Sequence, residues 1–141
     1  PEKRMLALDE RAATIGEARA LQIVAGDPVC AYHGLSLADG QPIAVFESLF
    51  PQARLVGITA ALKDTTSVTK ALSVVGVDDY TRASTRLTAV RATATHALLL
   101  HVAEGDPLLR SSSLNHSEDG LPVEYGRTWF AGDRVTLTLE T

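Results

Sequence analysis

Cysteine and aromatic residues are scarce in this sequence of 141 residues. Cys30 is the only cysteine, which excludes an internal disulfide and a zinc site built from cysteines, and which fits the reducing cytoplasm. Aromatic residues make up 5% of the chain, so leucine, valine, isoleucine and alanine must fill most of the core. The longest apolar runs, such as residues 97–100, are far too short to span a bilayer, and no signal peptide opens the chain. We therefore expect a cytoplasmic protein with no membrane partner.

A cluster of basic residues is also missing. The chain has 13 lysines and arginines against 17 acidic residues, for a net charge of −4. Because phosphate contacts supply most of the affinity for duplex DNA, a DNA-binding domain usually carries a basic patch. The length fits one domain with its own core, and the chain starts at Pro1, so we expect residues 1–141 to form a single domain of a longer protein. Any contact with DNA would then be made by a part outside this sequence.

The motifs of common enzyme sites are absent too. The chain has no glycine-rich phosphate loop, no Gly-x-Ser-x-Gly turn around a nucleophilic serine, and no obvious acid–base pair. His96 and His101 are five residues apart, which is not the spacing of a helical metal pair, and no further ligand completes a site. The sequence therefore predicts no catalytic residue, no metal site and no cofactor.

An internal repeat is the clearest feature that the sequence does contain. Gly-Asp-Pro-Val at 26–29 recurs as Gly-Asp-Pro-Leu at 105–108, and Asp-Gly-Gln-Pro-Ile at 39–43 recurs as Asp-Gly-Leu-Pro-Val at 119–123. Two further matched pairs follow these segments: Phe50 with Phe130, and Arg54 with Arg134. The chain is therefore expected to fold as two related halves.

Each half is predicted to contain a helix, a strand, a hairpin turn and a return strand. The helix should end in a left-handed cap at Gly26 or Gly105, because a proline follows each glycine closely. Asp-Gly is typical of tight hairpin turns. The strands that flank these turns are expected at 29–37 and 42–49 in the first half, and at 108–114 and 122–130 in the second.

Further elements are expected between the halves and at the two ends. A helix should run from the capping residues at 64–67 to about Val75, and a strand should follow at 80–91. End strands are expected at 4–11 and 135–140, the latter because apolar and polar residues alternate there. The predicted fold is α+β, with a mostly antiparallel sheet of six or seven strands, helices on its faces and a pseudo-twofold axis between the halves.

The repeated motifs and the closing Gly-Asp-Arg at 132–134 resemble the UTRA domain of GntR-type transcription regulators of the HutC subfamily. The resemblance covers nearly the whole chain, and the segment Tyr-Thr-Arg-Ala-Ser-Thr-Arg-Leu-Thr-Ala at 80–89 is most similar to regulators of phosphonate uptake and breakdown. It implies the fold of chorismate lyase, a small metabolite bound between the halves, and a homodimer. It also implies an N-terminal winged helix-turn-helix that binds DNA and that this chain lacks.

Thr66 and Ser67 are the first candidates for binding a small anionic effector. They lie in the turn before a predicted helix, where free N–H groups and the helix dipole favour negative charge. The resemblance implies that this turn touches the anionic group of the ligand. The alternative is that these residues only cap the helix.

Arg82 and Arg86 are candidates because they share a strand face with Ser84 if side chains alternate regularly. Guanidinium groups bind phosphate or phosphonate oxygens through two parallel hydrogen bonds. The alternative is a solvated strand face.

Glu124 and Ser36 complete the candidate set. The resemblance implies that a glutamate matching Glu124 lines the cavity. A carboxylate repels an anion, so Glu124 would bind an amino or hydroxyl group or orient an arginine, unless it is simply a surface residue. Many relatives carry Arg-x-Arg where this chain has Gly34 and Ser36, which argues against carrying over a sugar-phosphate ligand.

Two other functions remain open at this point. One is an enzyme of the chorismate-lyase type, since a fold does not fix a function. The other is a dimerisation module whose pocket is vestigial and filled by apolar side chains.

Overall fold

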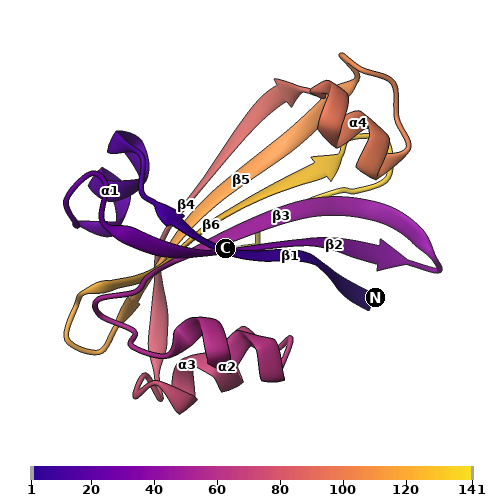
Figure 1. Cartoon of the computed structure of the whole chain (residues 1–141). Coiled ribbons are helices and arrows are strands. Elements are labelled where there is room, and N and C mark those ends of the chain that lie inside the picture. Colours follow the sequence, from indigo (N-terminus) through magenta and orange to yellow (C-terminus); the bar gives the residue numbers. More distant parts are fainter. Residues whose placement is uncertain (1, 141) are drawn as a thin grey trace.

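The computed structural model describes residues 2–140, which form one antiparallel sheet and four short helices (Figure 1). The sheet has six strands in the order β1-β2-β3-β6-β5-β4. This confirms the predicted α+β fold. Along the chain, the elements are β1 (Glu2–Ala12), α1 (Ile15–Leu21), β2 (Pro28–Ala38), β3 (Gln41–Pro51), α2 (Ile58–Asp64), α3 (Val68–Val74), β4 (Tyr80–Arg91), α4 (Ala94–Leu100), β5 (Pro107–Ser117) and β6 (Pro122–Ala131).

The two faces of the sheet carry different helices. α2 and α3 lie on one face, whereas α1 and α4 lie on the other, at opposite ends (Figure 1). Alternation along β2 explains how one strand serves both faces: Cys30 and Tyr32 pack in the cluster under α2 and α3, and Val29 and Ala31 pack in the cluster under α1. All four side chains are fully buried. None of the helices among residues 2–140 is long and apolar enough to cross a membrane.

The internal repeat is visible in the hydrogen bonds. The sheet order is symmetric about the β3–β6 pair, so each half supplies three neighbouring strands. The N–H of Ala13 donates to the carbonyl of Asp27 at 2.8 Å, and Ala92 makes the matching bond to Asp106 at 2.8 Å. Two related halves, predicted from the repeated segments, are thereby confirmed.

The matched arginines, Arg54 and Arg134, connect the two halves. Arg54 donates to the carbonyls of Leu21 and Gln22 at the end of α1, and to Pro122 in the opposite half at 2.8 Å. Arg134 makes the equivalent contacts at the end of α4, with Leu100, His101 and Pro42 of the first half. A cation at a helix C-terminus is favoured by the helix dipole and satisfies carbonyls that have no partner within the helix.

The predicted ends of α1 and α4 were wrong. The left-handed caps are Gln22, with φ of 55°, and His101, with φ of 56°. Gly26 and Gly105 instead form the next turn, where their φ values are 91° and 87°. There the N–H of Gly26 donates back to Ala13 at 2.9 Å and closes the loop that leads into β2. The positive φ that favours glycine belongs to this loop rather than to the helix end.

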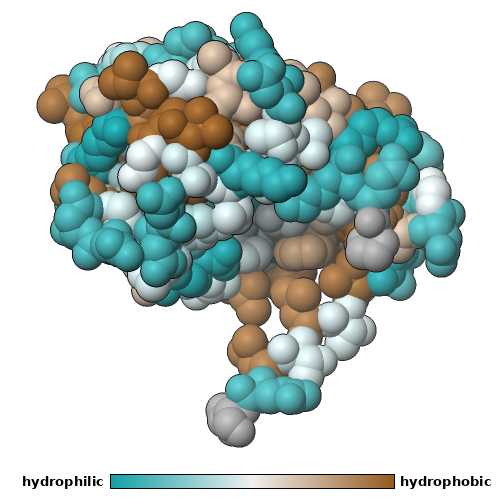
Figure 2. All heavy atoms as spheres, turned by 90° about the horizontal axis from the view of Figure 1, so that it is seen from below, coloured by the Kyte–Doolittle hydropathy of each residue, from teal (hydrophilic) through white to brown (hydrophobic). Residues whose placement is uncertain are grey.

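The strand predicted at 135–140 is also absent. Residues 135–140, called here the C-terminal arm, form no strand, and Leu137 and Leu139 are 40% and 85% exposed. β6 already pairs with β3 and β5. A segment that directly follows a central strand therefore has no free sheet edge beside it. Figure 2 shows the arm leaving the body of the molecule at its lower edge.

Candidate functional site

A cavity of about 610 Å³ lies on the face of the sheet that carries α3. The turn before α3, the start of β4 and side chains from all six strands line this cavity, called here the α3 pocket. Seen from below, this side of the molecule is hollowed near its middle (Figure 2). Five of the six residues proposed from the sequence line the pocket: Ser36, Thr66, Ser67, Arg82 and Glu124.

Arg86 is the exception, because β4 contains a bulge. Arg82 pairs with Asn115 and Ser84 pairs with Leu114, so Ala83 is an extra residue without a partner. A bulge of this kind reverses the alternation of side chains beyond it. Arg82 faces the α3 pocket, whereas Ser84 and Arg86 line a separate cavity of about 430 Å³. The expectation that these three residues share one face was wrong.

A row of hydrogen-bonded polar side chains crosses the pocket from β4 to β6. Arg82 Nε donates to Asn115 Oδ1 at 2.8 Å, and Asn115 Nδ2 donates to Glu124 Oε1 at 2.9 Å. Each residue is the direct cross-strand partner of the next. Asn115 is only 5% exposed, so its amide holds the cation and the carboxylate in fixed positions. Arg82 Nη1 also donates to Thr85 Oγ1 at 3.3 Å.

The turn before α3 combines a structural role with a place in the pocket. Ser67 caps α3, since its Oγ accepts the N–H of Lys70 at 3.2 Å. The N–H of Ser67 is itself occupied by Thr65 Oγ1 at 3.1 Å. Ser67 is therefore the N-cap of α3 as well as a residue of the pocket wall. The hydroxyl proton of Ser67 and the side chain of Thr66 remain available on the pocket wall.

Phe46 covers Gly34, the first of the two positions at which the family resemblance leads us to expect arginines in many relatives. A Cβ atom on Gly34 would lie 2.3 Å from Phe46 Cζ, so the ring lies directly over the glycine and leaves no room for a side chain there. Tyr32 packs edge-on against Phe46, with ring centroids 5.4 Å apart. Lys3 Nζ lies 5.6 Å from the Phe46 centroid. Lys3 and Arg82 are thus the two cationic residues that line the pocket.

Tyr32 was missed from the sequence. Its side chain is fully buried and lines the pocket, and its hydroxyl has no hydrogen-bond partner among residues 2–140. Burial raises the pKa of this hydroxyl, which keeps it protonated and able to donate. An unpaired buried polar group costs about 1–3 kcal/mol, so a ligand acceptor at this point would recover stability. Asn115 was missed as well, because nothing in its local sequence reveals that it faces Arg82 and Glu124.

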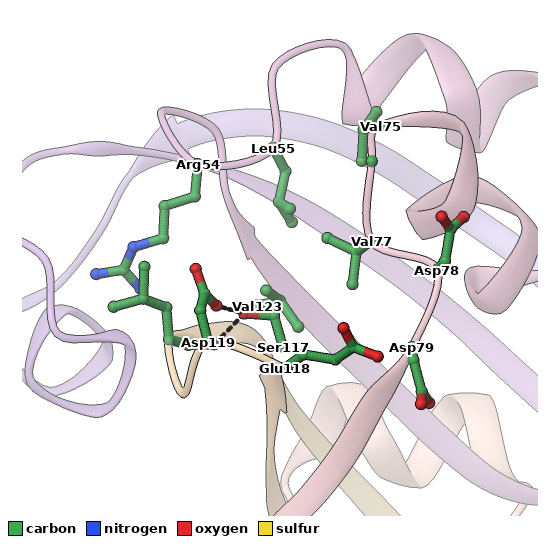
Figure 3. Close-up of a pocket in the computed structure, with 12 residues that line it drawn as sticks. Arg54, Leu55, Val75, Val77, Asp78, Asp79, Ser117, Glu118, Asp119 and Val123 are labelled. Atoms are coloured by element: carbon green, nitrogen blue, oxygen red, sulfur yellow. Dashed lines mark hydrogen bonds between the residues drawn. The ribbon is translucent and has the colours of Figure 1, made fainter.

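A second cavity of about 450 Å³ has a different character (Figure 3). Acidic side chains from two segments surround it, whereas its cation, Arg54, extends away toward the end of α1 (Figure 3). Asp119 accepts a hydrogen bond from the hydroxyl of Ser117. This cavity is unsuited to an anion, and no group of histidine, cysteine or acidic residues between positions 2 and 140 is arranged to hold a metal ion.

The opposite face of the sheet carries a network of charged residues beside α1. Arg11 donates to Glu17 at 2.7 and 2.9 Å, and Arg127 contacts both Glu17 and Glu47. Hydrogen bonding to Arg11 lowers the pKa of Glu17 to about 2 despite its burial. Glu17 also accepts the N–H of Thr14, so the network fixes the start of α1.

The pattern of strands and the paired hairpins agree with a known family. A family model described as the UTRA domain matches residues 1–136. The chain belongs to the UTRA domain family. It is 38% identical, over 88% of its length, to an HTH-type transcriptional regulator of Rhizobium meliloti strain 1021. The match covers 51% of that protein, so the chain spans about half the length of this curated relative.

Solved structures show the same fold. A GntR-family transcriptional regulator from Enterococcus faecalis V583 is 24% identical with a TM-score of 0.83, and the match covers 99% of this UTRA domain and all of that chain. The effector domain of PhnF from Mycobacterium smegmatis is 22% identical with a TM-score of 0.86, and the match covers 99% and 85% of the two chains. Both likenesses support the six-stranded α+β architecture.

Proposed function

We propose that this UTRA domain is the effector-sensing part of a DNA-binding transcription repressor, and that the α3 pocket binds a small anion that also carries an amino or hydroxyl group. The row of Arg82, Asn115 and Glu124 is the observation that carries this proposal. It places a cation and a carboxylate at fixed positions in one pocket. A ligand that satisfies both must carry opposite charges, or an anion and a neutral donor.

Simple electrostatics orient such a ligand. At 4 Å and an effective dielectric constant near 20, two like unit charges repel by about 4 kcal/mol. An oxyanion therefore avoids Glu124 and binds at the end of the row formed by Arg82. Arg82 Nη2 makes no hydrogen bond within residues 2–140, and Lys3 and Ser67 line the same pocket. Glu124 Oε2 is available to accept a hydrogen bond from the amine or hydroxyl, and the Tyr32 hydroxyl supplies a further donor.

Phosphonates and phosphate-related metabolites are the ligand class that we favour. The segment at 80–89 resembles regulators of phosphonate metabolism in the HutC subfamily, and the fold matches the effector domain of PhnF. An aminoalkylphosphonate combines an oxyanion with an amine, as the row requires. The aromatic wall of Phe46 and Tyr32 suits the short alkyl part of such a molecule.

The proposed mechanism is a change in dimer geometry. The ligand would join the turn before α3 to β4, β5 and β6, and so change how these elements pack. In a cytoplasmic homodimer, an effector that favours one arrangement of the two domains also favours one spacing of the attached DNA-binding domains. DNA would be contacted only through such N-terminal domains, because this domain carries a net charge of −4.

The two alternatives receive less support from the pocket. A vestigial pocket would be filled by apolar side chains, but the α3 pocket has a volume of about 610 Å³ and many polar lining residues. A chorismate-lyase-type enzyme would require a reactive group poised on the substrate. The polar row instead ties the pocket carboxylate to an amide, which suits binding.

A thermal-shift panel tests the proposal. Melting temperatures would be measured with 2-aminoethylphosphonate, ethylphosphonate, ethylamine, phosphate, N-acetylglucosamine 6-phosphate and chorismate. A ligand at about 100 times its Kd stabilises the fold by about 2.7 kcal/mol, which corresponds to several degrees. We expect the aminoalkylphosphonate to give a larger shift than ethylphosphonate or ethylamine alone. A panel without any shift would contradict the proposed ligand class, and turnover of chorismate would favour the enzyme.

A further inference from the structure

The face of the sheet opposite the α3 pocket contains a second polar cavity. It has a volume of about 430 Å³ and is called here the β4–β5 cavity, because most of its lining residues come from these two strands. α1 and α4 lie at opposite ends of this face, and Ala20 of α1 contributes to the wall of the cavity (Figure 1). The contacts proposed above for the effector lie on the other face of the sheet.

Two arginines and two hydroxyl side chains alternate along the β4–β5 cavity. In the pairing of β4 with β5, Arg86 lies opposite Ser112, and Thr88 lies opposite Arg110. All four residues line the cavity, so the two arginines are diagonal neighbours on one face of the sheet. Diagonal neighbours are about 7–8 Å apart in a sheet, which lets two long side chains converge on one ligand. Ser84 adds a third hydroxyl group to the same lining.

The positive charges of Arg86 and Arg110 are not compensated by the protein. Neither residue takes part in an ion pair within residues 2–140, and no acidic residue of this part of the chain lines the cavity. The carboxylates of Glu17 and Glu47 on this face are instead bonded to other arginines. Arg110 Nε is buried and has no hydrogen-bond partner among residues 2–140. Two neighbouring cations repel each other, and a buried donor without a partner is costly, so a bound anion would relieve both.

We propose that the β4–β5 cavity is a second binding site, and that it takes a small, multiply charged oxyanion of the phosphate type between Arg86 and Arg110. A guanidinium group binds such an oxyanion through two parallel N–H···O hydrogen bonds. The hydroxyl groups of Ser84, Thr88 and Ser112 can donate to the remaining oxygens. The site goes beyond the proposed effector site, because its two arginines line a different cavity from that of Arg82.

The charges of the two cavities favour different ligands. The α3 pocket has Glu124 in the same polar row as Arg82, which suits a ligand with both an oxyanion and an amine. The β4–β5 cavity has two cations and no carboxylate in its lining, so it repels the ammonium group of an aminoalkylphosphonate. We therefore expect inorganic phosphate to prefer the β4–β5 cavity and 2-aminoethylphosphonate to prefer the α3 pocket.

An NMR titration of the backbone amides with inorganic phosphate tests the second site. Sodium chloride at matched ionic strength controls for the screening of surface charge. We expect saturable shifts centred on residues 84–88 and 110–112, and Arg86→Gln should raise the phosphate Kd at least about tenfold. Arg91→Gln is the matched control: it removes the same charge from an exposed position of β4 outside the cavity and should change the Kd less than about threefold. Residue 86 is exposed too, so neither change should unfold the domain.

Three results would overturn the second site. Equal losses of phosphate affinity in Arg86→Gln and Arg91→Gln, or shifts that never saturate, would show general attraction by charge. Shifts confined to the α3 pocket, around Ser67 and Asn115, would place phosphate on the other face. A loss of 2-aminoethylphosphonate affinity in Arg86→Gln would show that the two ligands share one site. Failure of phosphate to bind would leave the effector proposal intact, because the thermal-shift panel tests that proposal with a different ligand.

Discussion

Arg82→Gln and Arg86→Gln form a matched pair of substitutions that tests which face of β4 holds the effector. Both remove one positive charge from the same strand, so any long-range attraction for an anion falls equally in the two variants. Only Arg82 lines the α3 pocket, because the bulge at Ala83 directs Arg86 to the other face. Only Arg82→Gln should therefore weaken binding directly.

The expected magnitude follows from the contact that is lost. A hydrogen bond to a charged group contributes about 1.5–3 kcal/mol, so Arg82→Gln should raise the Kd about 10- to 150-fold. Arg86→Gln should change the Kd by less than about threefold. Isothermal titration with 2-aminoethylphosphonate measures both values. Melting without ligand is needed as well, since Arg82 also bonds Asn115, and any loss of stability must be separated from the loss of affinity.

Two results would refute this reasoning. An equal loss of affinity in both variants would mean that the anion is attracted by general charge or that β4 lacks the bulge in solution. No loss in Arg82→Gln would remove the cationic end of the polar row from the site. Either outcome would require a different location for the oxyanion.

Three further predictions concern the pocket wall and the charged network. Tyr32→Phe should weaken effector binding by about tenfold while leaving the ligand-free melting temperature equal or higher, because it removes a buried hydroxyl without a partner; lower ligand-free stability would show that the hydroxyl is satisfied in solution. Gly34→Ala should destabilise the domain by about 1–3 kcal/mol, as its Cβ would overlap the Phe46 ring; Gly16→Ala, where a Cβ meets nothing within 4 Å, is the control for denaturant melts. Glu17 has its pKa depressed to about 2, so its contribution to stability is present above about pH 4.5 and is lost as the pH falls towards 2. The stability difference between the unchanged protein and Glu17→Gln, up to about 3 kcal/mol at neutral pH, should therefore shrink over that range, and a difference independent of pH would contradict the pairing with Arg11.

The sequence predicted the order of elements well because the relevant signals are local. Repeated Gly-Asp-Pro and Asp-Gly-x-Pro segments mark turns, and turns separate the strands. The turn before α3, which forms one wall of the pocket, was also predictable, because Ser67 caps a helix whose position is set by its own residues. The bulge at Ala83 was not, because it exists only in the pairing of β4 with β5. Asn115 and Tyr32 were missed for a related reason: their roles depend on which strands become neighbours.

The strand predicted at 135–140 is absent because its sequence pattern carries no information about a pairing partner. Its alternating pattern reports what the segment would bury, but not whether a free edge lies within reach in the same molecule. β6 ends inside the sheet, so the pattern has nothing to pair with in one chain. The predicted end of α1 was wrong for a different reason. Gly26 indicates a residue with positive φ, but such a residue can belong either to a helix cap or to the loop that follows it.

The contacts that Arg54 and Arg134 make between the two halves have a consequence for how the domain unfolds. Each arginine holds the helix of its own half while bonding a carbonyl in the other, so neither half completes its own structure alone. The two halves should unfold in one cooperative transition, despite their repeated sequence. A chain cut between α3 and β4 should yield two fragments that are disordered separately and that regain the sheet when they are mixed.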